Sequence, residues 1–406
     1  SGWYESNNDY RYGHVKLCFL LTIVHSDGRK SIIVSDRNVK KHKSFLSECD
    51  IITGETQNFE NFPDNWKNAD FDDSSWENAT VEKAPDTCYY PQNCPGDRVI
   101  RRIVPTLIAK KNGKRIYDVG EILTGYPVIY SPQGKKQKIT IRYSELLDNE
   151  GKLDELKVYN QHTVFYTDDT QRTLHAMFTW LCFRYFEVEG ECEVGNCLVF
   201  HSDVAVNSSF SCVSDVLNWF YNAYISTQLA NMHGGVPSDC PHTERRGYTG
   251  DGQLVCNAAM TYLDAQSFYK KWIYDIADCQ DKITGHVQYT APFVPNSGGG
   301  PGGWGCAIVN VPYEYYRHYR DRSVLVNLYP KMLRYFEYLE NHSKNDLVVS
   351  DRKGSWCLGE WVTPEQETVN LFSGIKIPAP FVNTYFYIKS IKQVLEIAEL
   401  LGITKD

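Results

Sequence analysis

The chain of 406 residues lacks an excess of positive charge, a long apolar run and any regular repeat. Its 42 Lys and Arg residues are outnumbered by 50 Asp and Glu residues, which gives a net charge of −8. Because nucleic-acid binding needs a basic surface to neutralise phosphates, nucleic acid is not an expected partner. The most apolar stretch, residues 17–24, is much shorter than the roughly 20 residues of a membrane-spanning helix. We therefore predict a buried strand there and no membrane association.

The thirteen cysteines form no Cys-x-x-Cys pair. The shortest spacings join Cys88 to Cys94 and Cys192 to Cys197, and zinc-binding clusters place their ligands closer together. The sequence therefore predicts no metal site. Numerous cysteines in an odd number favour a reducing compartment, so the cytoplasm is preferred over the periplasm, although the sequence leaves the compartment open.

Aromatic residues are abundant, with 28 Tyr and 9 Trp in a share of 14%. The rest of the composition, 42% hydrophobic and 23% charged, is that of a folded globular protein long enough for more than one domain. A surplus of aromatic rings is typical of proteins that stack flat apolar faces of a ligand. For any single ring, core packing is the plainer role.

The residue pattern changes character near residue 208. Before it, short runs such as 138–143 and 183–189 alternate with a period of two, and turn signals such as Asn112-Gly113 separate the runs. This pattern predicts one or two antiparallel β-sandwich domains over residues 1–208.

After residue 208 the apolar period becomes helical. Ser214 is placed to cap a first helix, and apolar side chains line one face of residues 325–339 and of residues 381–398. We count about six or seven helices and predict an all-α domain over residues 209–406. A glycine-rich loop at residues 296–305 is long enough to indicate a functional role.

One short stretch concentrates charge and turn residues. Residues 238–251, Ser-Asp-Cys-Pro-His-Thr-Glu-Arg-Arg-Gly-Tyr-Thr-Gly-Asp, are called the acid segment below. The segment holds Asp239, Glu244 and Asp251 in a backbone stiffened by Pro241, and a solvated charged loop has no need of such stiffness. Cleavage of a glycoside needs a carboxylic acid that stays protonated, and neighbouring carboxylates favour that form while arginines oppose it. When an acid cluster is the only evidence, an ion-pair network explains it more often than an active site does.

The acid segment closely resembles the signature of the bacterial α-L-rhamnosidases, glycoside hydrolase family 78. Further stretches resemble markers of this family, in the family's order: residues 71–76, 117–120, 142–151, 182–190, 304–307 and 351–363. The resemblance covers nearly the whole chain. It implies N-terminal antiparallel β-sandwich domains followed by an all-α catalytic domain of the (α/α)6-barrel type, here incomplete at its C-terminal end. It also implies inverting hydrolysis of terminal α-L-rhamnosides without a cofactor.

The resemblance assigns roles to individual residues, with Glu244 as the general acid. The residues implied to bind the sugar are Asp239, Asp251, Arg245, Tyr248, Trp304 and Trp361. These roles are physically reasonable, because short acids accept hydrogen bonds from sugar hydroxyls and rings cover the apolar face of a deoxy sugar. Each has an alternative: Arg245 as a clamp on Asp239 or Asp251, Tyr248 and Trp304 as packing residues, and Trp356 in place of Trp361.

The sequence departs from the family pattern at three points. Cys306 and Glu360 both stand where the family has Asp, which indicates an altered sugar subsite. Inversion also needs a second carboxylate roughly 6.5–9.5 Å from the acid. In the family this base lies later in the barrel, and we expect it beyond Asp406, in a missing C-terminal segment or a second chain that completes the barrel. Without it, this chain alone is expected to be weakly active or inactive.

Two other functions stay open at this stage. A sugar-binding protein with a decayed site would retain the acids and rings but lack the base. An (α/α)6 glycosidase for a different sugar would keep the barrel and change the pocket, because a fold does not fix a function.

Overall fold

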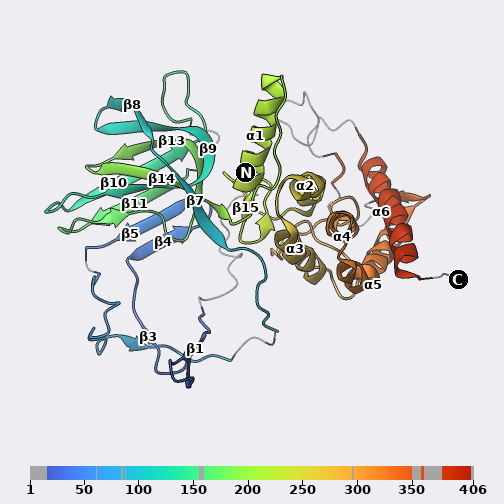
Figure 1. The fold of residues 1–406 in the computed structure, drawn as a ribbon, viewed down its shortest axis with the longest axis horizontal. Coiled ribbons are helices and arrows are strands. Elements are labelled where there is room, and N and C mark those ends of the chain that lie inside the picture. The colour runs from blue at the N-terminus through green and yellow to red at the C-terminus, as the bar shows by residue number, and fades with distance from the viewer. Residues whose placement is uncertain are drawn as a thin grey trace.

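The computed structural model describes residues 16–403, apart from residue 61, residues 84–85, residue 87, and residues 155–159, 295–296, 350–357 and 361–376. Strands dominate up to Ser202 and helices from Asp215 onward. These two parts are called the sheet half and the helical half. Figure 1 shows them side by side, with the first long helix between the sheet and the other helices.

The sheet half is built on one large sheet of ten strands. Its strands are β4 (Leu46–Asp50), β5 (Gly54–Asn58), β7 (Asp97–Ile103), β8 (Thr106–Lys111), β9 (Lys114–Tyr130), β10 (Gln137–Ser144), β11 (His162–Thr167), β12 (Thr173–Leu174), β13 (Leu181–Glu189) and β14 (Glu193–Ser202). The order is β4-β5-β11-β10-β13-β9-β14-β7, with β8 and β12 also paired to β9. Among the described strands of this sheet, neighbours pair antiparallel except β5 with β11, which confirms the predicted antiparallel β architecture.

Strand β9 lets this sheet curve around its own core. Its first part pairs with β8 and β13, and its second part pairs with β14 and β12. The curved sheet encloses large side chains that are 0% exposed, among them Phe165, Phe183 and Phe186. The period-two runs of the sequence lie in β10 and β13, where inward residues alternate with outward ones.

Two small strand pairs of the sheet half lie outside the large sheet. One pairs β1 (Leu20–Val24) with β2 (Lys30–Val34), and the other pairs β3 (Lys40–Lys41) with β6 (Glu77–Asn78). The strand expected at residues 17–24 is present as β1, but its predicted burial is wrong, because all residues of β1 and β2 are exposed. A two-stranded hairpin has two open faces, and apolar periodicity cannot show whether another layer covers them.

The helical half contains six helices among the residues that can be described. They are α1 (Asp215–Ala230), α2 (Thr249–Tyr262), α3 (Gln266–Asp278), α4 (Ala307–Tyr319), α5 (Arg322–Glu340) and α6 (Ala379–Leu401). Two short hairpins connect them: β15 (Met232–His233) with β16 (Val236–Pro237), and β17 (Ser343–Lys344) with β18 (Leu347–Val348). Ser214 caps α1 as predicted, since its hydroxyl accepts a hydrogen bond from the Leu217 N–H. No described helix has the length and apolarity that a bilayer crossing requires.

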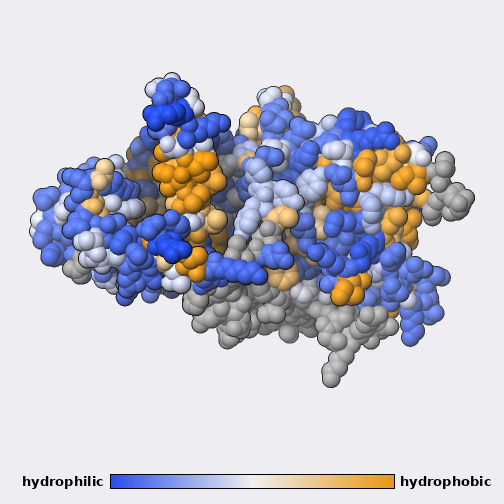
Figure 2. All heavy atoms as spheres, turned by 90° about the horizontal axis from the view of Figure 1, so that it is seen from below, coloured by the Kyte–Doolittle hydropathy of each residue, from blue (hydrophilic) through white to orange (hydrophobic). Residues whose placement is uncertain are grey.

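The core of the helical half forms where α2, α3, α4 and α5 pack together, around side chains such as Trp272, Tyr315 and Tyr335. The two outer helices keep apolar side chains at the surface: on α1, Val216, Leu217, Trp219 and Phe220; on α6, Phe381, Tyr385, Ile388 and Leu395. Figure 2 shows hydrophobic side chains gathered at the surface of both halves.

The two halves are joined where α1 packs on β9 and β14. Next to this contact the His233 ring stacks on Trp180, with centroids 3.7 Å apart and an angle of 10° between the rings. His233 also pairs with Asp97 of β7, its Nδ1 lying 3.2 Å from the carboxylate. The change from strand to helix therefore falls between Ser202 and Asp215. The domain boundary at residues 208 and 209 itself stays a prediction.

Candidate active site

The acid segment runs from the end of β16 into the first turn of α2. Two hydrogen bonds close its loop: the Asp239 N–H donates to the Arg246 carbonyl oxygen at 3.1 Å, and the Arg246 N–H donates to Asp239 Oδ1 at 3.0 Å. Glu244 lies within the closed loop. Gly247 is required by a close approach, because a Cβ there would lie 2.1 Å from the carbonyl oxygen of Ala291. The turn-stiffened backbone inferred from the sequence is thus held by specific contacts.

Asp239 is the most strongly perturbed acid of the segment. Its pKa is raised to about 6, chiefly by burial and in smaller part by the charges of Glu244 and Asp251. Hydrogen bonds from the Cys240 thiol and the Arg246 N–H oppose this shift by stabilising the carboxylate. Because the three acids influence one another electrostatically, the structure brings Asp239, Glu244 and Asp251 together in space.

Asp251 occupies the first turn of α2. Its side chain is exposed, yet desolvation and the nearby charge of Glu244 raise its pKa above the ordinary value. Exposure and desolvation occur together here because protein surrounds the carboxylate on most sides while one side faces solvent. The helix N-terminus acts in the opposite direction and favours the charged form.

The position of Asp239 predicts a gain in stability when its charge is removed. An acid whose pKa is raised by folding stabilises the fold in its protonated form, and that contribution is lost as pH rises from about 4 through about 6. The Asp239→Asn variant should therefore have a higher free energy of unfolding than the wild type at pH 7.5, by about 1–3 kcal/mol. Urea unfolding at pH 7.5 and pH 4 measures this, and the gain should vanish at pH 4. A variant less stable at pH 7.5, or a difference independent of pH, would contradict the assigned environment.

Glu244 is oriented by Tyr248. The tyrosine hydroxyl donates a hydrogen bond to Glu244 Oε2 at 2.5 Å. Burial, and then this hydrogen bond, raise the pKa of Tyr248 well above its usual range, so the phenol stays protonated and remains a donor. Tyr248 therefore fixes the direction of the carboxyl group, while its predicted contact with a sugar stays a prediction.

Trp304 lies directly against the start of α2. A Cβ added to Gly250 would lie 2.3 Å from both Nε1 and Cε2 of the indole, so the ring packs onto the backbone next to Asp251. The ring is partly buried and lies 5.5 Å from Tyr289, centroid to centroid. Gln253 of α2 donates to the Gly303 carbonyl oxygen at 2.7 Å and holds the loop in place. The glycine-rich loop thus brings an aromatic face to the acids.

Arg245 points into the sheet half. Its Nε donates to the Pro241 carbonyl oxygen at 2.8 Å, Nη1 to the carbonyl oxygens of Trp180, at 2.7 Å, and Ile51, and Nη2 to Gln161 Oε1 at 2.7 Å. The expected clamp on Asp239 or Asp251 is therefore wrong, because these groups engage the guanidinium instead. A direct contact between Arg245 and a sugar, which stays an untested prediction, would require some of these hydrogen bonds to break.

Other residues named from the sequence lie farther from the acids or outside the described residues. Cys306 is 0% exposed, in the helical core at the start of α4, so this departure from the family pattern falls on a core position. Trp361 and Trp356 lie outside the described residues. Glu360 is partly buried, and the Leu358 N–H nearby donates to the Tyr289 hydroxyl at 2.9 Å, which places this part of the chain beside the ring that contacts Trp304.

Sequence reasoning missed the residues of the sheet half that reach the acid segment. Gln161 and Trp180 hold Arg245, and Glu145 Oε1 lies 3.4 Å from His242 Nδ1. Glu145 belongs to the marker stretch at residues 142–151, and Trp180 comes just before another. The signal was present as a set of markers, but nothing in the sequence showed that these markers meet at one place.

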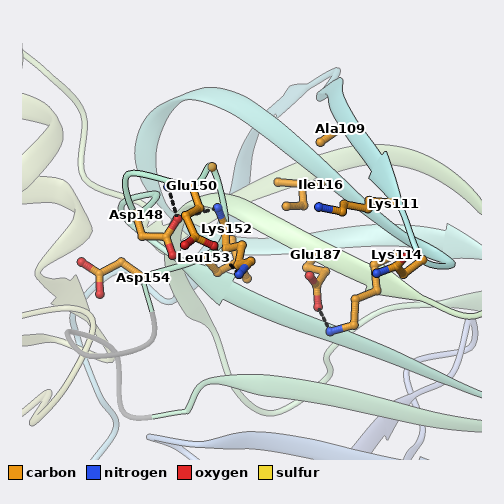
Figure 3. Close-up of a pocket in the computed structure, with 12 residues that line it drawn as sticks. Ala109, Lys111, Lys114, Ile116, Asp148, Glu150, Lys152, Leu153, Asp154 and Glu187 are labelled. Carbon is orange, nitrogen blue, oxygen red and sulfur yellow. Dashed lines mark hydrogen bonds and ion pairs between the residues drawn. The ribbon is translucent and has the colours of Figure 1, made fainter.

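A separate groove lies wholly on the sheet half. It has a volume of about 810 Å³ and is lined by residues of the stretches 109–116 and 148–154, together with Glu187. Figure 3 shows Lys114 paired with Glu187 and Lys152 paired with Glu150 across this lining. Its lining residues are of mixed charge, none is aromatic and none belongs to the acid segment, so it does not have the character of a sugar pocket.

Within the described ranges, no three His, Cys, Asp or Glu side chains are arranged to hold a metal ion.

Comparison with known proteins identifies the family. Consecutive parts of the chain match three family models: the alpha-L-rhamnosidase N-terminal domain over residues 1–101, the bacterial alpha-L-rhamnosidase concanavalin-like domain over 108–206, and the bacterial alpha-L-rhamnosidase 6 hairpin glycosidase domain over 205–406. The structure agrees with the order of these models, because a sheet-rich part is followed by a helical part that matches the six-hairpin glycosidase model, with acids clustered up to the first turn of α2. The chain therefore belongs to the bacterial α-L-rhamnosidase family, glycoside hydrolase family 78.

Characterised relatives and solved structures agree with this assignment. The chain is 26% identical to an alpha-L-rhamnosidase of Formosa agariphila over 94% of its length and 27% identical to one of Streptomyces avermitilis over 90%. One similar solved structure is an α-L-rhamnosidase from Dictyoglumus thermophilum, with a TM-score of 0.85 and 26% identity over 98% of this chain. Another is the Streptomyces avermitilis α-L-rhamnosidase complexed with L-rhamnose, with a TM-score of 0.81 and 25% identity over 95% of this chain. The chain spans 42% and 37% of the two curated relatives and 45% and 37% of the two solved chains.

Proposed function

We propose that the protein hydrolyses terminal α-L-rhamnosides with inversion, and that Glu244 is the general acid. Membership of the family and the names of its relatives support the substrate class. The single observation that carries the assignment of the acid is the placement of Glu244, held by Tyr248 and coupled electrostatically to Asp239 and Asp251.

In the proposed reaction Glu244 donates its proton to the glycosidic oxygen as the bond from that oxygen to the anomeric carbon breaks. A water molecule attacks the anomeric carbon from the opposite face and loses its proton to a second carboxylate, so the released sugar has the inverted configuration. We assign this base to no described residue. We further propose that additional helices of the six-hairpin domain cover the exposed apolar faces of α1 and α6 and carry the base.

The remaining residues bind the sugar in this proposal. Asp239, with a pKa of about 6, is ionised at neutral pH and accepts hydrogen bonds from sugar hydroxyls, as does Asp251. Trp304 offers its face to the apolar side of a deoxy sugar, since it already lies against the backbone beside Asp251. The assignment of Trp361 to the same pocket remains part of the proposal.

The test is a substrate panel with the full native protein. It should hydrolyse 4-nitrophenyl α-L-rhamnoside in preference to the corresponding glucosides and glucuronides, and NMR of the first product should show β-L-rhamnose. Retention of configuration would contradict the mechanism. Turnover of another sugar with no action on rhamnosides would favour a glycosidase of different specificity, and binding of rhamnose without turnover would favour a sugar-binding protein.

Tyr248 should influence how the proposed acid is positioned. The Tyr248→Phe variant removes the hydroxyl that fixes the direction of the Glu244 carboxyl group. We expect kcat for an alkyl α-L-rhamnoside to fall by about 10-fold through looser positioning, with KM little changed. Steady-state kinetics measures this, and an unchanged kcat would show that this hydrogen bond does not position the acid.

A further inference from the structure

The residues on both sides of Glu244 are held by the sheet half. Arg245 follows it directly and reaches Gln161, Trp180 and Ile51, while His242, two residues before it, pairs with Glu145 at 3.4 Å. The proposed acid belongs to the helical half. Its flanking residues are therefore anchored on a different part of the chain.

The anchor for Arg245 is itself rigid. The guanidinium lies over the Trp180 ring, 4.1 Å from its centroid, and the same ring stacks on His233. Gln161 is oriented from both ends, because its Nε2 donates to the Cys182 carbonyl oxygen and its Oε1 accepts from the Cys182 N–H.

The backbone leading to Trp180 is fixed in a similar way. The carboxylate of Glu55, which is 1% exposed, accepts hydrogen bonds from the N–H groups of Met177, Phe178 and Thr179. These bonds hold the turn immediately before Trp180. The surface that receives Arg245 is thus held by hydrogen bonds of its own.

The burial of the Arg245 guanidinium costs free energy. The side chain is only 9% exposed, and burial lowers its pKa to about 10 because desolvation penalises the charged form. The guanidinium donates hydrogen bonds to carbonyl and amide oxygens, so neutral groups bind the buried charge. Its φ of +53° is also rare for a residue with a side chain and persists only where the surroundings enforce it.

We propose that the sheet half positions the general acid and that Arg245 is the positioning residue. The guanidinium fixes the backbone at residue 245, and the pair of His242 with Glu145 fixes the other side, so that the carboxyl group of Glu244 is presented in one orientation. This inference rests on the proposed function of Glu244 as the acid. It adds that the acid depends on contacts made by a separate part of the chain.

The first test compares two rhamnosides in the full native protein. A 2,4-dinitrophenyl group leaves without protonation, whereas an alkyl group needs the acid. In the Arg245→Met variant, kcat for the alkyl rhamnoside should fall about 100-fold and kcat for the dinitrophenyl rhamnoside less than about 5-fold, with KM little changed. Arg245→Lys, which keeps the charge but not the planar fork, should recover part of the loss. An equal fall with both substrates would overturn the inference.

Arg172 supplies the matched control for this test. It is also a poorly exposed arginine of the sheet half, but its partners are Asp64, Asp168 and the Phe59 ring, 4.6 Å away, and all three lie outside the acid segment. Arg172→Met should lower stability without changing the ratio of the two rates. If it changes that ratio as much as Arg245→Met does, general destabilisation explains both variants and the positioning role is refuted.

A second readout separates this inference from the proposed function. Amide hydrogen exchange of residues 239–248 should be about 10-fold faster in Arg245→Met than in the wild type, and unchanged in Arg172→Met. Unchanged exchange in Arg245→Met would overturn the inference whatever the activity. If exchange is faster in Arg245→Met but the wild type does not hydrolyse rhamnosides, the anchoring of the loop by Arg245 is supported and only the proposed function is rejected.

Discussion

Replacing Glu244 by Gln should lower kcat for an alkyl α-L-rhamnoside by about 10²–10⁴-fold, the usual contribution of a general acid. Glutamine keeps the size of the side chain and can still accept the hydrogen bond from Tyr248, so the loop should fold as before. It has no acidic proton to give to the leaving oxygen. The rate with the dinitrophenyl rhamnoside, whose leaving group needs no proton, should fall much less. Steady-state kinetics with both substrates measures the effect.

Glu396→Gln is the matched control for this variant. Glu396 also accepts a hydrogen bond from a tyrosine hydroxyl, that of Tyr313, but it lies on α6 outside the acid segment. Its replacement should leave both rates unchanged. If Glu244→Gln behaves like Glu396→Gln, then Glu244 is not the acid. If it lowers both rates equally, its role is structural.

Replacing Gly250 by Ala should destabilise the protein although alanine favours helices. Within a helix this change ordinarily stabilises by about 1 kcal/mol. Here the new Cβ would lie 2.3 Å from the indole of Trp304, and a rigid ring system cannot bend away as a flexible chain end can. We expect a net loss of about 1–3 kcal/mol in the free energy of unfolding, measured with urea, and a KM for rhamnosides raised at least about 10-fold because Trp304 is displaced.

Two further variants make this prediction specific. In a Trp304→Ala background the clash is absent, so Gly250→Ala should become neutral or stabilising. Gly252→Ala, two residues along α2, would place a Cβ 2.2 Å from Trp272 in the core, and it should lower stability without raising KM to the same extent. A destabilising Gly250→Ala in the absence of Trp304, or equal KM values for the two glycine variants, would contradict the placement of Trp304 at the site.

Local signals in the sequence predicted the local structure well. Ser214 caps α1, and the alternating runs at 138–143 and 183–189 lie within strands β10 and β13. Each of these features depends on neighbours a few residues away, so the periodicity and the capping residue are sufficient to find it. The resemblance to a family added the order of the domains, which the family models bear out.

Contacts between distant segments could not be predicted in the same way. The sequence contains Arg245 beside Glu244, but the partners of Arg245 in the sheet half lie 65–194 positions earlier in the chain. Cys306 was expected near the pocket from its place after Trp304, yet the start of α4 turns it into the core. Strand β1 is exposed because no second layer of described residues covers it. The pattern of apolar residues within the strand cannot show whether such a layer is present.

The acid segment shows both what local sequence signals can predict and what they cannot. Its composition and its resemblance to the family singled out Asp239, Glu244 and Asp251. Their mutual electrostatic influence, the hydrogen bond from Tyr248 and the raised pKa of Asp239 follow only from the folded geometry.

The most direct test of the central claim is a crystal structure of the full native protein with L-rhamnose bound. The account predicts that the anomeric oxygen of the α anomer, which stands for the glycosidic oxygen, lies about 2.6–3.2 Å from a carboxyl oxygen of Glu244, the reach of proton transfer. It also predicts that ring hydroxyls donate to Asp239 and Asp251 and that the Trp304 ring lies against the sugar. Rhamnose bound elsewhere, for instance in the charged groove of the sheet half, with Glu244 out of reach of the sugar, would contradict it.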